Sequence, residues 1–156
     1  MYEVKRVSLI NLPGQFKVNN ILYDCGKDMA KKYDLHHWDN SHFKNLIIVV
    51  LCELKNAVYL VTDRGKPVAT FQIKQVEKTM RFEKLACSPI YSGKGIGSFC
   101  MNYIETLARK SNCEKVCMEV YSPSKHALEF YLHKGYKICG ETKTLKYSEI
   151  KMEKIV

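Results

Sequence analysis

The sequence predicts a mixed α/β fold, in which helices flank a sheet without a regular alternation of strand and helix. Two observations support this class. Segments in which apolar residues recur every two positions are interspersed with segments in which they recur every three or four. In chain order these segments predict a strand, two helices, three strands, a helix, a strand, a helix and two strands. The 156 residues, 46% hydrophobic and 26% charged, fit one compact domain over residues 1–156.

The first half of the chain is predicted to hold three strands, at 2–10, 57–62 and 67–76. Pro13 and Gly14 are expected to end the first of them. A helix is expected over 21–33, where apolar residues fall at three- and four-residue intervals. The β-branched run at 46–54 suits either a buried strand or a helix, and we predict a helix because its apolar side chains also form a helical stripe. A hairpin turn at 63–66 joins the two later strands.

The second half is predicted to hold four strands, at 79–87, 115–121, 136–140 and 147–155. A helix is expected to begin near Gly95, since apolar residues line one face of the segment that follows. Another helix is expected after the second of these strands, with Ser122 as its cap, Pro123 at its first position and Gly135 at its end. This order differs from that of a doubly wound fold, in which strands and helices alternate throughout.

Composition and charge exclude several classes of protein. No apolar run approaches the roughly 20 residues that cross a bilayer, so no membrane partner is expected, and the first residues lack the pattern of a secretory signal. Seven scattered cysteines, an odd number, indicate reduced thiols, as in the cytoplasm. A formal charge of +9 favours an anionic ligand. Basic residues are spread along the whole chain, which argues against nucleic acid as that ligand.

The segment 92–98, which reads Ser-Gly-Lys-Gly-Ile-Gly-Ser, lies where a predicted strand gives way to a predicted helix. Glycines allow backbone N–H groups to approach a ligand closely, and the start of a helix adds partial positive charge. Lys94 adds a full charge, so a pyrophosphate is the expected ligand, and a flexible connecting turn is the alternative. The spacing matches neither a P-loop nor a dinucleotide fingerprint, which would need glycine where Ser98 stands.

The stretch 85–136 resembles the GNAT superfamily of N-acetyltransferases in two blocks. The first is the acetyl-CoA motif Arg/Gln-x-x-Gly-x-Gly/Ala, which is matched from Ser92 to Gly97 and preceded by Pro89. The second block is matched, in chain order, by Ser124, Ala127, Phe130, Tyr131, Gly135 and Tyr136. The chain departs from the family pattern in having serine at the first position of each block and Tyr136 in place of phenylalanine.

The resemblance implies a mixed, mostly antiparallel sheet of about seven strands flanked by four helices, in a single N-acetyltransferase domain. It also implies that acetyl-CoA is the co-substrate and that no metal takes part. The pantetheine arm would run along the fourth strand and be held by Leu85, Ala86 and Cys87. The pyrophosphate would be held by Gly93, Lys94, Gly95, Ile96, Gly97 and Ser98.

The same resemblance implies two proton transfers. An ammonium group must lose a proton before its nitrogen can attack the thioester, and the departing thiolate leaves more easily when it is protonated. Tyr131 occupies the position of the family's general acid; the alternative is a core aromatic residue. Glu119 is the first candidate for the general base and Glu83 is the second. Alternatively, both are solvated strand carboxylates and a water molecule serves as the base.

The cluster around Trp38 is a candidate acceptor site. Residues 36–39 read His-His-Trp-Asp, and His42 follows them. Trp38 would form an apolar or cation–π wall around an amine, or it is a buried residue in a helix connection. A metal site built from the three histidines is disfavoured, because adjacent side chains diverge. Cys87 is not expected to act as a nucleophile, since direct transfer needs no acyl-enzyme.

These features predict an N-acetyltransferase that transfers the acetyl group of acetyl-CoA directly to a primary amine. The acceptor would be a small molecule, a protein N-terminus or a lysine. An alternative is a GNAT-like domain that binds acyl-CoA without catalysis, which is suggested by the departures at the first positions of the two blocks. A third hypothesis is a basic domain that binds nucleic acid. Whether two chains pair into a homodimer is left open.

Overall fold

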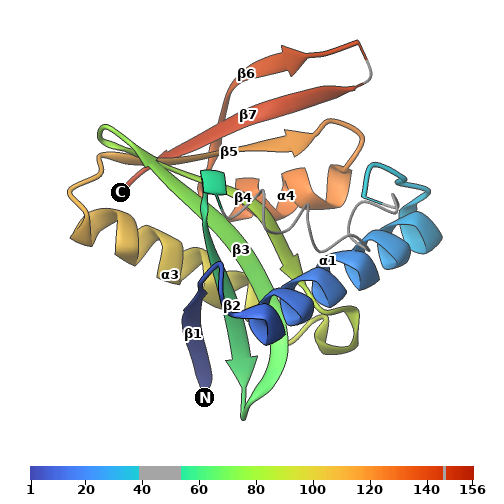
Figure 1. Cartoon of the computed structure of the whole chain (residues 1–156). Helices are drawn as coiled ribbons and strands as arrows, with labels where there is room; N and C mark the ends of the chain where they lie inside the picture. Colours follow the sequence, from blue (N-terminus) through green and yellow to red (C-terminus); the bar gives the residue numbers. More distant parts are fainter. Residues whose placement is uncertain (39–53, 146) are drawn as a thin grey trace. The chain divides into compact units, whose positions relative to one another are not determined.

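The structure is a computed structural model, and it describes residues 1–38, 54–145 and 147–156 (Figure 1). The elements in these ranges are, in chain order, β1 (Tyr2–Val7), α1 (Leu12–Tyr33), β2 (Ala57–Asp63), β3 (Lys66–Val76), β4 (Thr79–Cys87), a short 3₁₀ helix (Pro89–Tyr91), α3 (Ile96–Lys110), β5 (Lys115–Tyr121), α4 (Lys125–His133), β6 (Lys137–Lys143) and β7 (Ser148–Ile155). The helix expected at 46–54 lies outside the described residues, except for its last position.

The seven strands form one sheet in the order β1-β2-β3-β4-β5-β7-β6. β4 pairs with β5 in parallel, whereas β2 pairs antiparallel with β1 and β3, and β7 pairs antiparallel with β5 and β6. The predicted mixed, mostly antiparallel sheet is therefore confirmed. Three α-helices accompany it in the described ranges, against the four expected. None of these helices has both the length and the apolar character needed to cross a bilayer.

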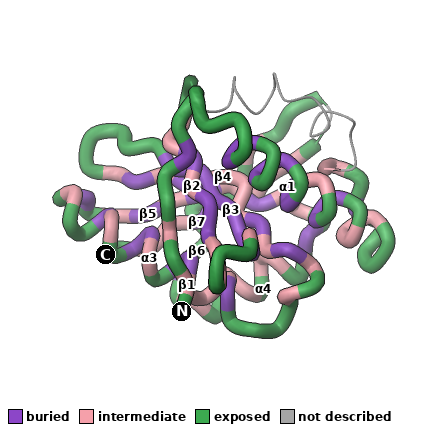
Figure 2. The backbone as a smooth tube through the Cα atoms, turned by 60° about the horizontal axis from the view of Figure 1, so that its bottom comes forward, coloured by how far each residue is buried: buried purple, intermediate pink, exposed green. Residues whose placement is uncertain are grey.

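The chain divides into two compact units. The N-terminal unit comprises Met1–Lys74 and Lys84–Asn102, and the C-terminal unit comprises Gln75–Glu83 and Tyr103–Val156. In the N-terminal unit, buried residues follow β2 and β3 (Figure 2). Apolar side chains of α1 pack there against apolar side chains of the strands, and together they form one core cluster of Val7, Val18, Ile21, Leu22, Cys25, Val58, Leu60 and Ala86.

The first helix begins nine residues earlier than predicted, because Pro13 and Gly14 lie inside it rather than ending the preceding strand. β1 ends at Val7, and the side chain of Asn11 caps the helix by accepting a hydrogen bond of 3.0 Å from the N–H of Gly14. Proline is tolerated in the first turn, where its missing N–H would have no helical partner. A Cβ atom on Gly14 would lie 2.8 Å from Asn11 Nδ2, so this cap needs glycine.

The hairpin between β2 and β3 is tighter than the predicted turn at 63–66. Its two central residues, Arg64 and Gly65, have φ angles of 49° and 77°. Positive φ at both positions matches the twist of adjacent antiparallel strands. The flanking residues, Asp63 and Lys66, already pair in the ladder.

In the C-terminal unit, strand residues alternate between an apolar core face and a polar face. The core face carries Met80, Phe82, Val116, Met118, Val120 and Met152, each 5% exposed or less. The ladders put Glu119 opposite Lys151, Tyr121 opposite Glu149, and Glu149 opposite Thr142 on the other face. The second face is therefore where this unit gathers its polar side chains.

The predicted start of the last helix is wrong by two residues. Ser124, not Ser122, is the N-cap of α4, and Pro123 precedes the helix instead of opening it. The N–H of Ser124 bonds to the carbonyl of Tyr121 at 2.8 Å, so the chain turns once before the helix begins. Gly135, at a φ of 84°, follows the helix as expected.

Candidate active site

The glycine-rich turn of the N-terminal unit lies between the 3₁₀ helix and α3. The N–H of Ser92 bonds to the carbonyl of Pro89 at 3.1 Å, and the chain then passes through Gly93 and Gly95, both at a φ of 75°. A Cβ atom at either glycine would meet no atom within 4 Å. These glycines are thus required by the backbone conformation, and the space beside them is open to a ligand.

The turn presents hydrogen-bond donors at the start of α3. The carbonyl of Gly95 accepts the N–H of Phe99 at 3.0 Å, which places Ile96, Gly97 and Ser98 in the first helical turn. The N–H groups of a first turn have no acceptor within the helix, and they carry the positive end of its dipole. Lys94 lies nearby with its Nζ 5.0 Å from the ring centre of Tyr91. This open cradle of backbone donors and one cation fits a diphosphate.

The end of β4, where Leu85, Ala86 and Cys87 lie, contacts thiols from two helices. Ala86 is buried in the core beneath α1. Cys25 of α1 donates from its Sγ to the carbonyl of Cys87 at 2.9 Å, which occupies one acceptor site of that carbonyl and leaves its second lone pair. Burial raises the pKa of Cys25 to about 12, and a hydrogen bond with the thiol of Cys100 lowers the pKa of Cys87.

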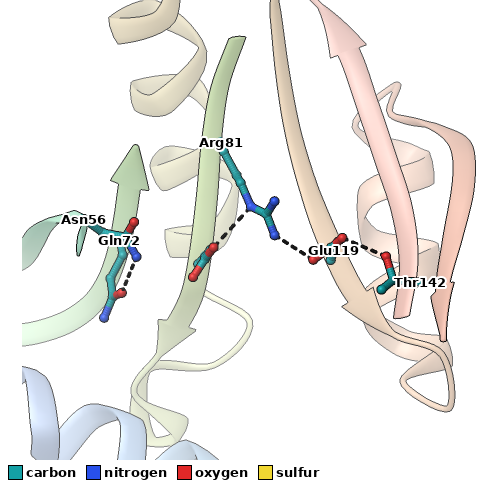
Figure 3. A network of polar contacts seen from close by, with 6 residues as sticks. Asn56, Gln72, Arg81, Glu119 and Thr142 are labelled. Atoms are coloured by element: carbon teal, nitrogen blue, oxygen red, sulfur yellow. Dashed lines mark hydrogen bonds and ion pairs between the residues drawn. The ribbon is translucent and has the colours of Figure 1, made fainter. Parts of the chain in front are cut away.

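In the C-terminal unit, the structure brings the two candidate bases onto one arginine (Figure 3). Arg81 of β4 donates from Nε to Glu83 Oε1 at 3.1 Å and from Nη2 to Glu119 Oε2 at 2.6 Å. The hydroxyl of Thr142 on β6 donates to the other oxygen of Glu119, Oε1, at 3.0 Å. Glu119 is the more enclosed of the two carboxylates, with 19% of its side chain exposed against 39% for Glu83.

Glu149 of β7 is a titratable neighbour that the sequence reasoning missed. Burial, together with the negative charges of Glu119 and Glu83, raises its pKa, and Arg81 opposes that rise. The ladders place Glu149 opposite Tyr121 on one side and Thr142 on the other. The sequence signals that β7 is a strand, but it does not signal that β7 lies between β5 and β6.

Tyr131, the candidate acid, is held in an aromatic cluster of the same unit. Its ring centre lies 5.2 Å from that of Phe130, 5.8 Å from that of Phe82 and 6.1 Å from that of Tyr136. The hydroxyl of Tyr136 donates to Glu105 at 3.3 Å, and burial raises the pKa of Tyr136. Tyr131 therefore occupies a fixed, half-buried position on α4. Its neighbour Tyr136 uses its own hydroxyl to bond to the buried Glu105.

Trp38 is partly buried and packs against the core cluster of the N-terminal unit. Its backbone carbonyl oxygen lies against α1, because a Cβ atom on Gly26 would be only 2.4 Å from it. His36 pairs with Asp34 at 2.9 Å, whereas Asp39 and His42 lie outside the described residues. These contacts match the alternative in which Trp38 is a structural residue of the helix connection.

The predicted site residues thus fall into two sets. The residues expected to hold the coenzyme, and Trp38, belong to the N-terminal unit, whereas Tyr131, Glu119 and Glu83 belong to the C-terminal unit. Among the residues that the structure describes, no three histidine, cysteine, aspartate or glutamate side chains are grouped as metal ligands.

Comparison with known proteins gives a family match and close structural matches. The Acetyltransferase (GNAT) family model matches residues 19–136, which is more than half of the chain. The PaiA N-acetyltransferase from Thermoplasma acidophilum, solved in complex with coenzyme A, has a TM-score of 0.81 at 15% identity, covering 100% of this chain and 99% of that one. The ribosomal-protein-S18-alanine N-acetyltransferase from Escherichia coli has a TM-score of 0.73 at 14% identity, covering 99% and 94%.

An aminoglycoside 6'-N-acetyltransferase complexed with coenzyme A is similar as well, with a TM-score of 0.72 at 14% identity and coverage of 98% and 96% of the two chains. At these identities the structural matches establish the fold, whereas the family assignment rests on the family model. With that model extending across the glycine-rich turn and the helix of Tyr131, this chain belongs to the GNAT acetyltransferase family.

Proposed function

We propose that the protein is an N-acetyltransferase that moves the acetyl group of acetyl-CoA directly to a primary amine. The observation that carries this proposal is the open glycine-rich turn at the start of α3, where Gly93 and Gly95 both adopt a φ of 75° with free space beside them. Coenzyme A in two of the similar structures supports the same choice of co-substrate.

The coenzyme would be held by backbone groups of the N-terminal unit. The first-turn N–H groups of α3, with Lys94, would bind the pyrophosphate through charge and direct hydrogen bonds. Leu85, Ala86 and Cys87 would bind the pantetheine arm along β4, with the carbonyl of Cys87 contributing the lone pair that Cys25 leaves. Because backbone atoms make most of these contacts, serine at position 92 is compatible with binding.

Acetyl-CoA supplies a thioester whose carbonyl carbon is open to attack by an amine. The acceptor arrives as an ammonium ion, and Glu119 or Glu83 would take its proton, directly or through a water molecule. The amine nitrogen then forms a bond to the acetyl carbon, the carbon–sulfur bond breaks, and Tyr131 would donate its phenolic proton to the departing sulfur, while the second proton lost by the acylated nitrogen returns Tyr131 to its phenol form through solvent. The half-buried setting of Tyr131 on α4 and the enclosed setting of Glu119 support these roles.

The acceptor would be a small-molecule amine, a protein N-terminus or a lysine. The similar structures include enzymes named for a ribosomal-protein alanine and for an aminoglycoside, so both kinds of acceptor belong in a test panel. Trp38 remains a candidate wall for the amine. Its packing against the core favours a supporting role there.

Release of the coenzyme A thiol, followed with a panel of amines, tests this function. We expect release that depends on both acetyl-CoA and one class of amine, together with an acetylated product in the mass spectrum. Tight binding of acetyl-CoA without amine-dependent release would instead support the acyl-CoA-binding alternative. A protein that binds neither coenzyme A nor acetyl-CoA in calorimetry would contradict both.

A further inference from the structure

Arg81 occupies an unusual position in the C-terminal unit. The parallel ladder joins β4 to β5 over Thr79–Arg81 and Lys115–Cys117. The last pair of this ladder is Arg81 with Cys117. The guanidinium group of Arg81 bonds to the carboxylates that lie two residues further along the two strands, Glu83 on β4 and Glu119 on β5. One side chain therefore links the two candidate bases of the proposed reaction.

Glu119 is held from two sides. Arg81 donates to Oε2 at 2.6 Å, and Thr142 donates to Oε1 at 3.0 Å. The two donors come from β4 and β6, so the carboxylate has a separate partner on each oxygen (Figure 3). A carboxylate with both oxygens engaged loses rotational freedom, which is what a group that must meet a proton at one place requires.

The pair between Arg81 and Glu119 contributes little to stability on general grounds. The side chain of Arg81 is 41% exposed. Ion pairs that reach solvent stabilise a fold only slightly, because water screens them and both side chains lose freedom. A nearby pair, Lys115 with Glu153 at 2.8 Å, has similar exposure, 40% on the lysine, and contacts neither candidate base. Arg81 therefore differs from Lys115 in the carboxylates that it contacts, and not in how strongly its ion pair stabilises the fold.

Arg81 is a cation of this face that bonds to both candidate bases. The charged groups that share the face through the ladders are Arg81 and Glu83 on β4, Lys115 and Glu119 on β5, Glu149, Lys151 and Glu153 on β7, and Lys137 on β6, and Lys115 is paired with Glu153. The pKa of Glu149 is raised by burial and by Glu119 and Glu83, while Arg81 lowers it. Loss of Arg81 would therefore remove the cation that bonds to both Glu83 and Glu119. In general, a carboxylate that loses a neighbouring positive charge holds its proton to higher pH.

We propose that Arg81 and Thr142 are positioning residues for acetyl transfer, which fix the carboxylate of Glu119 in one orientation from opposite sides. This inference rests on the proposed function. It adds two residues that neither the sequence pattern nor the family blocks indicate, and it makes Glu83 and Glu119 parts of one assembly rather than independent alternatives.

The test compares pH–rate profiles of Arg81→Gln, Arg81→Lys, Thr142→Val and Thr142→Ser with Lys115→Gln as the matched control. For Arg81→Gln we expect the acidic limb to move up by about one pH unit and kcat to fall about ten- to hundredfold, with the KM for acetyl-CoA unchanged. In Arg81→Lys the acidic limb should lie between its positions in Arg81→Gln and in the wild type. Thr142→Ser should have a higher kcat than Thr142→Val. Lys115→Gln should match the wild type.

A profile of Arg81→Gln that superimposes on the wild-type profile would overturn this inference while leaving the proposed function intact. If the wild-type protein releases no thiol in response to amines, the proposed function is overturned, and with it the positioning role of Arg81 and Thr142. If circular dichroism shows that Arg81→Gln does not fold, Arg81→Lys and the two Thr142 variants decide. Equal rates for Thr142→Ser and Thr142→Val, together with an unshifted acidic limb in the pH–rate profile of Arg81→Lys, would reject the proposal.

Discussion

At the scale of single residues, Gly65 has the same kind of backbone conformation as the two positive-φ glycines of the turn before α3. Gly65, in the β2–β3 hairpin, has a φ of 77°, and a Cβ atom added there would also meet no atom within 4 Å. A substitution is therefore strained at both Gly65 and Gly95, because positive φ disfavours a residue with a Cβ atom. The two positions differ in what lies beside them, which is a hairpin at one and the proposed coenzyme cradle at the other.

Gly95→Val is expected to weaken binding of coenzyme A about tenfold or more, which corresponds to the loss of one or two hydrogen bonds. Gly65→Val should leave that affinity unchanged. Both variants should lose about 1–2 kcal/mol of stability, because valine is strained at positive φ. Calorimetric titration with coenzyme A and thermal unfolding separate the two effects. Equal affinities in the two variants would count against the cradle.

Tyr131 and Tyr136 offer a second matched comparison, because each can lose its hydroxyl and keep its ring. Tyr131→Phe is expected to lower the rate of acetyl transfer by at least about tenfold, since general acids commonly contribute more than that, with no change in affinity for acetyl-CoA. Tyr136→Phe breaks the hydrogen bond to Glu105 and should cost about 1 kcal/mol of stability while leaving the rate intact. An unaltered rate in Tyr131→Phe would remove it from the acid role.

At the scale of elements, β4 and β5 were predicted to the residue, whereas the ends of β1 and β6 and the starts of two helices were missed. β4 and β5 match the expected 79–87 and 115–121, because alternating apolar residues mark both of their ends. The starts of α1 and α4 were missed for different reasons. At α1, Pro13 and Gly14 indicate the end of a strand as readily as the first turn of a helix, and the cap by Asn11 decides for the helix. At α4, Ser122 and Ser124 lie close enough in sequence that either could serve as the cap.

The middle of α1 makes a close contact that reverses an ordinary expectation. Glycine inside a helix is usually improved by alanine, by about 1 kcal/mol. At Gly26, however, a Cβ atom would lie 2.4 Å from the carbonyl oxygen and 2.9 Å from the carbonyl carbon of Trp38. Backbone atoms cannot rotate away as a side chain can, so α1 and the segment of Trp38 would have to move apart.

Gly26→Ala is therefore expected to destabilise the protein by about 1–3 kcal/mol, as overpacking does. Gly140→Ala on β6 is the control, since a Cβ atom there would meet only the Lys151 side chain at 3.6 Å, an ordinary contact. Denaturant unfolding followed by circular dichroism gives both values. A stabilised Gly26→Ala would show that Trp38 does not lie tightly against α1.

At the scale of the whole molecule, local patterns indicated the order of elements but not which strands become neighbours. The two family blocks lie in contiguous stretches, so the sequence alone singles out Tyr131 and the glycine-rich turn as candidates. The polar assembly of Arg81, Glu119, Thr142 and Glu149 was not, because it draws on four strands. β7 inserts between β5 and β6, and the period of a single strand carries no information on its partner.

The whole molecule carries a net positive charge. The chain carries 25 lysine and arginine residues against 16 aspartate and glutamate residues. A positive field of this kind raises the encounter rate with an anionic coenzyme. Within this field, the carboxylates of Glu83, Glu119 and Glu149 lie close to one another, with Arg81 beside them.

Thiol placement bears on how turnover should be recorded. Cys139 lies exposed on β6, whereas Cys25 and Cys100 are buried. A chromogenic disulfide that reports liberated coenzyme A will also be consumed by Cys139, which adds an offset proportional to protein concentration rather than to time. Cys139→Ser would remove the contribution of Cys139 to that background, and it should leave the hydrogen bond from β6 to Glu119 in place, because that bond comes from Thr142.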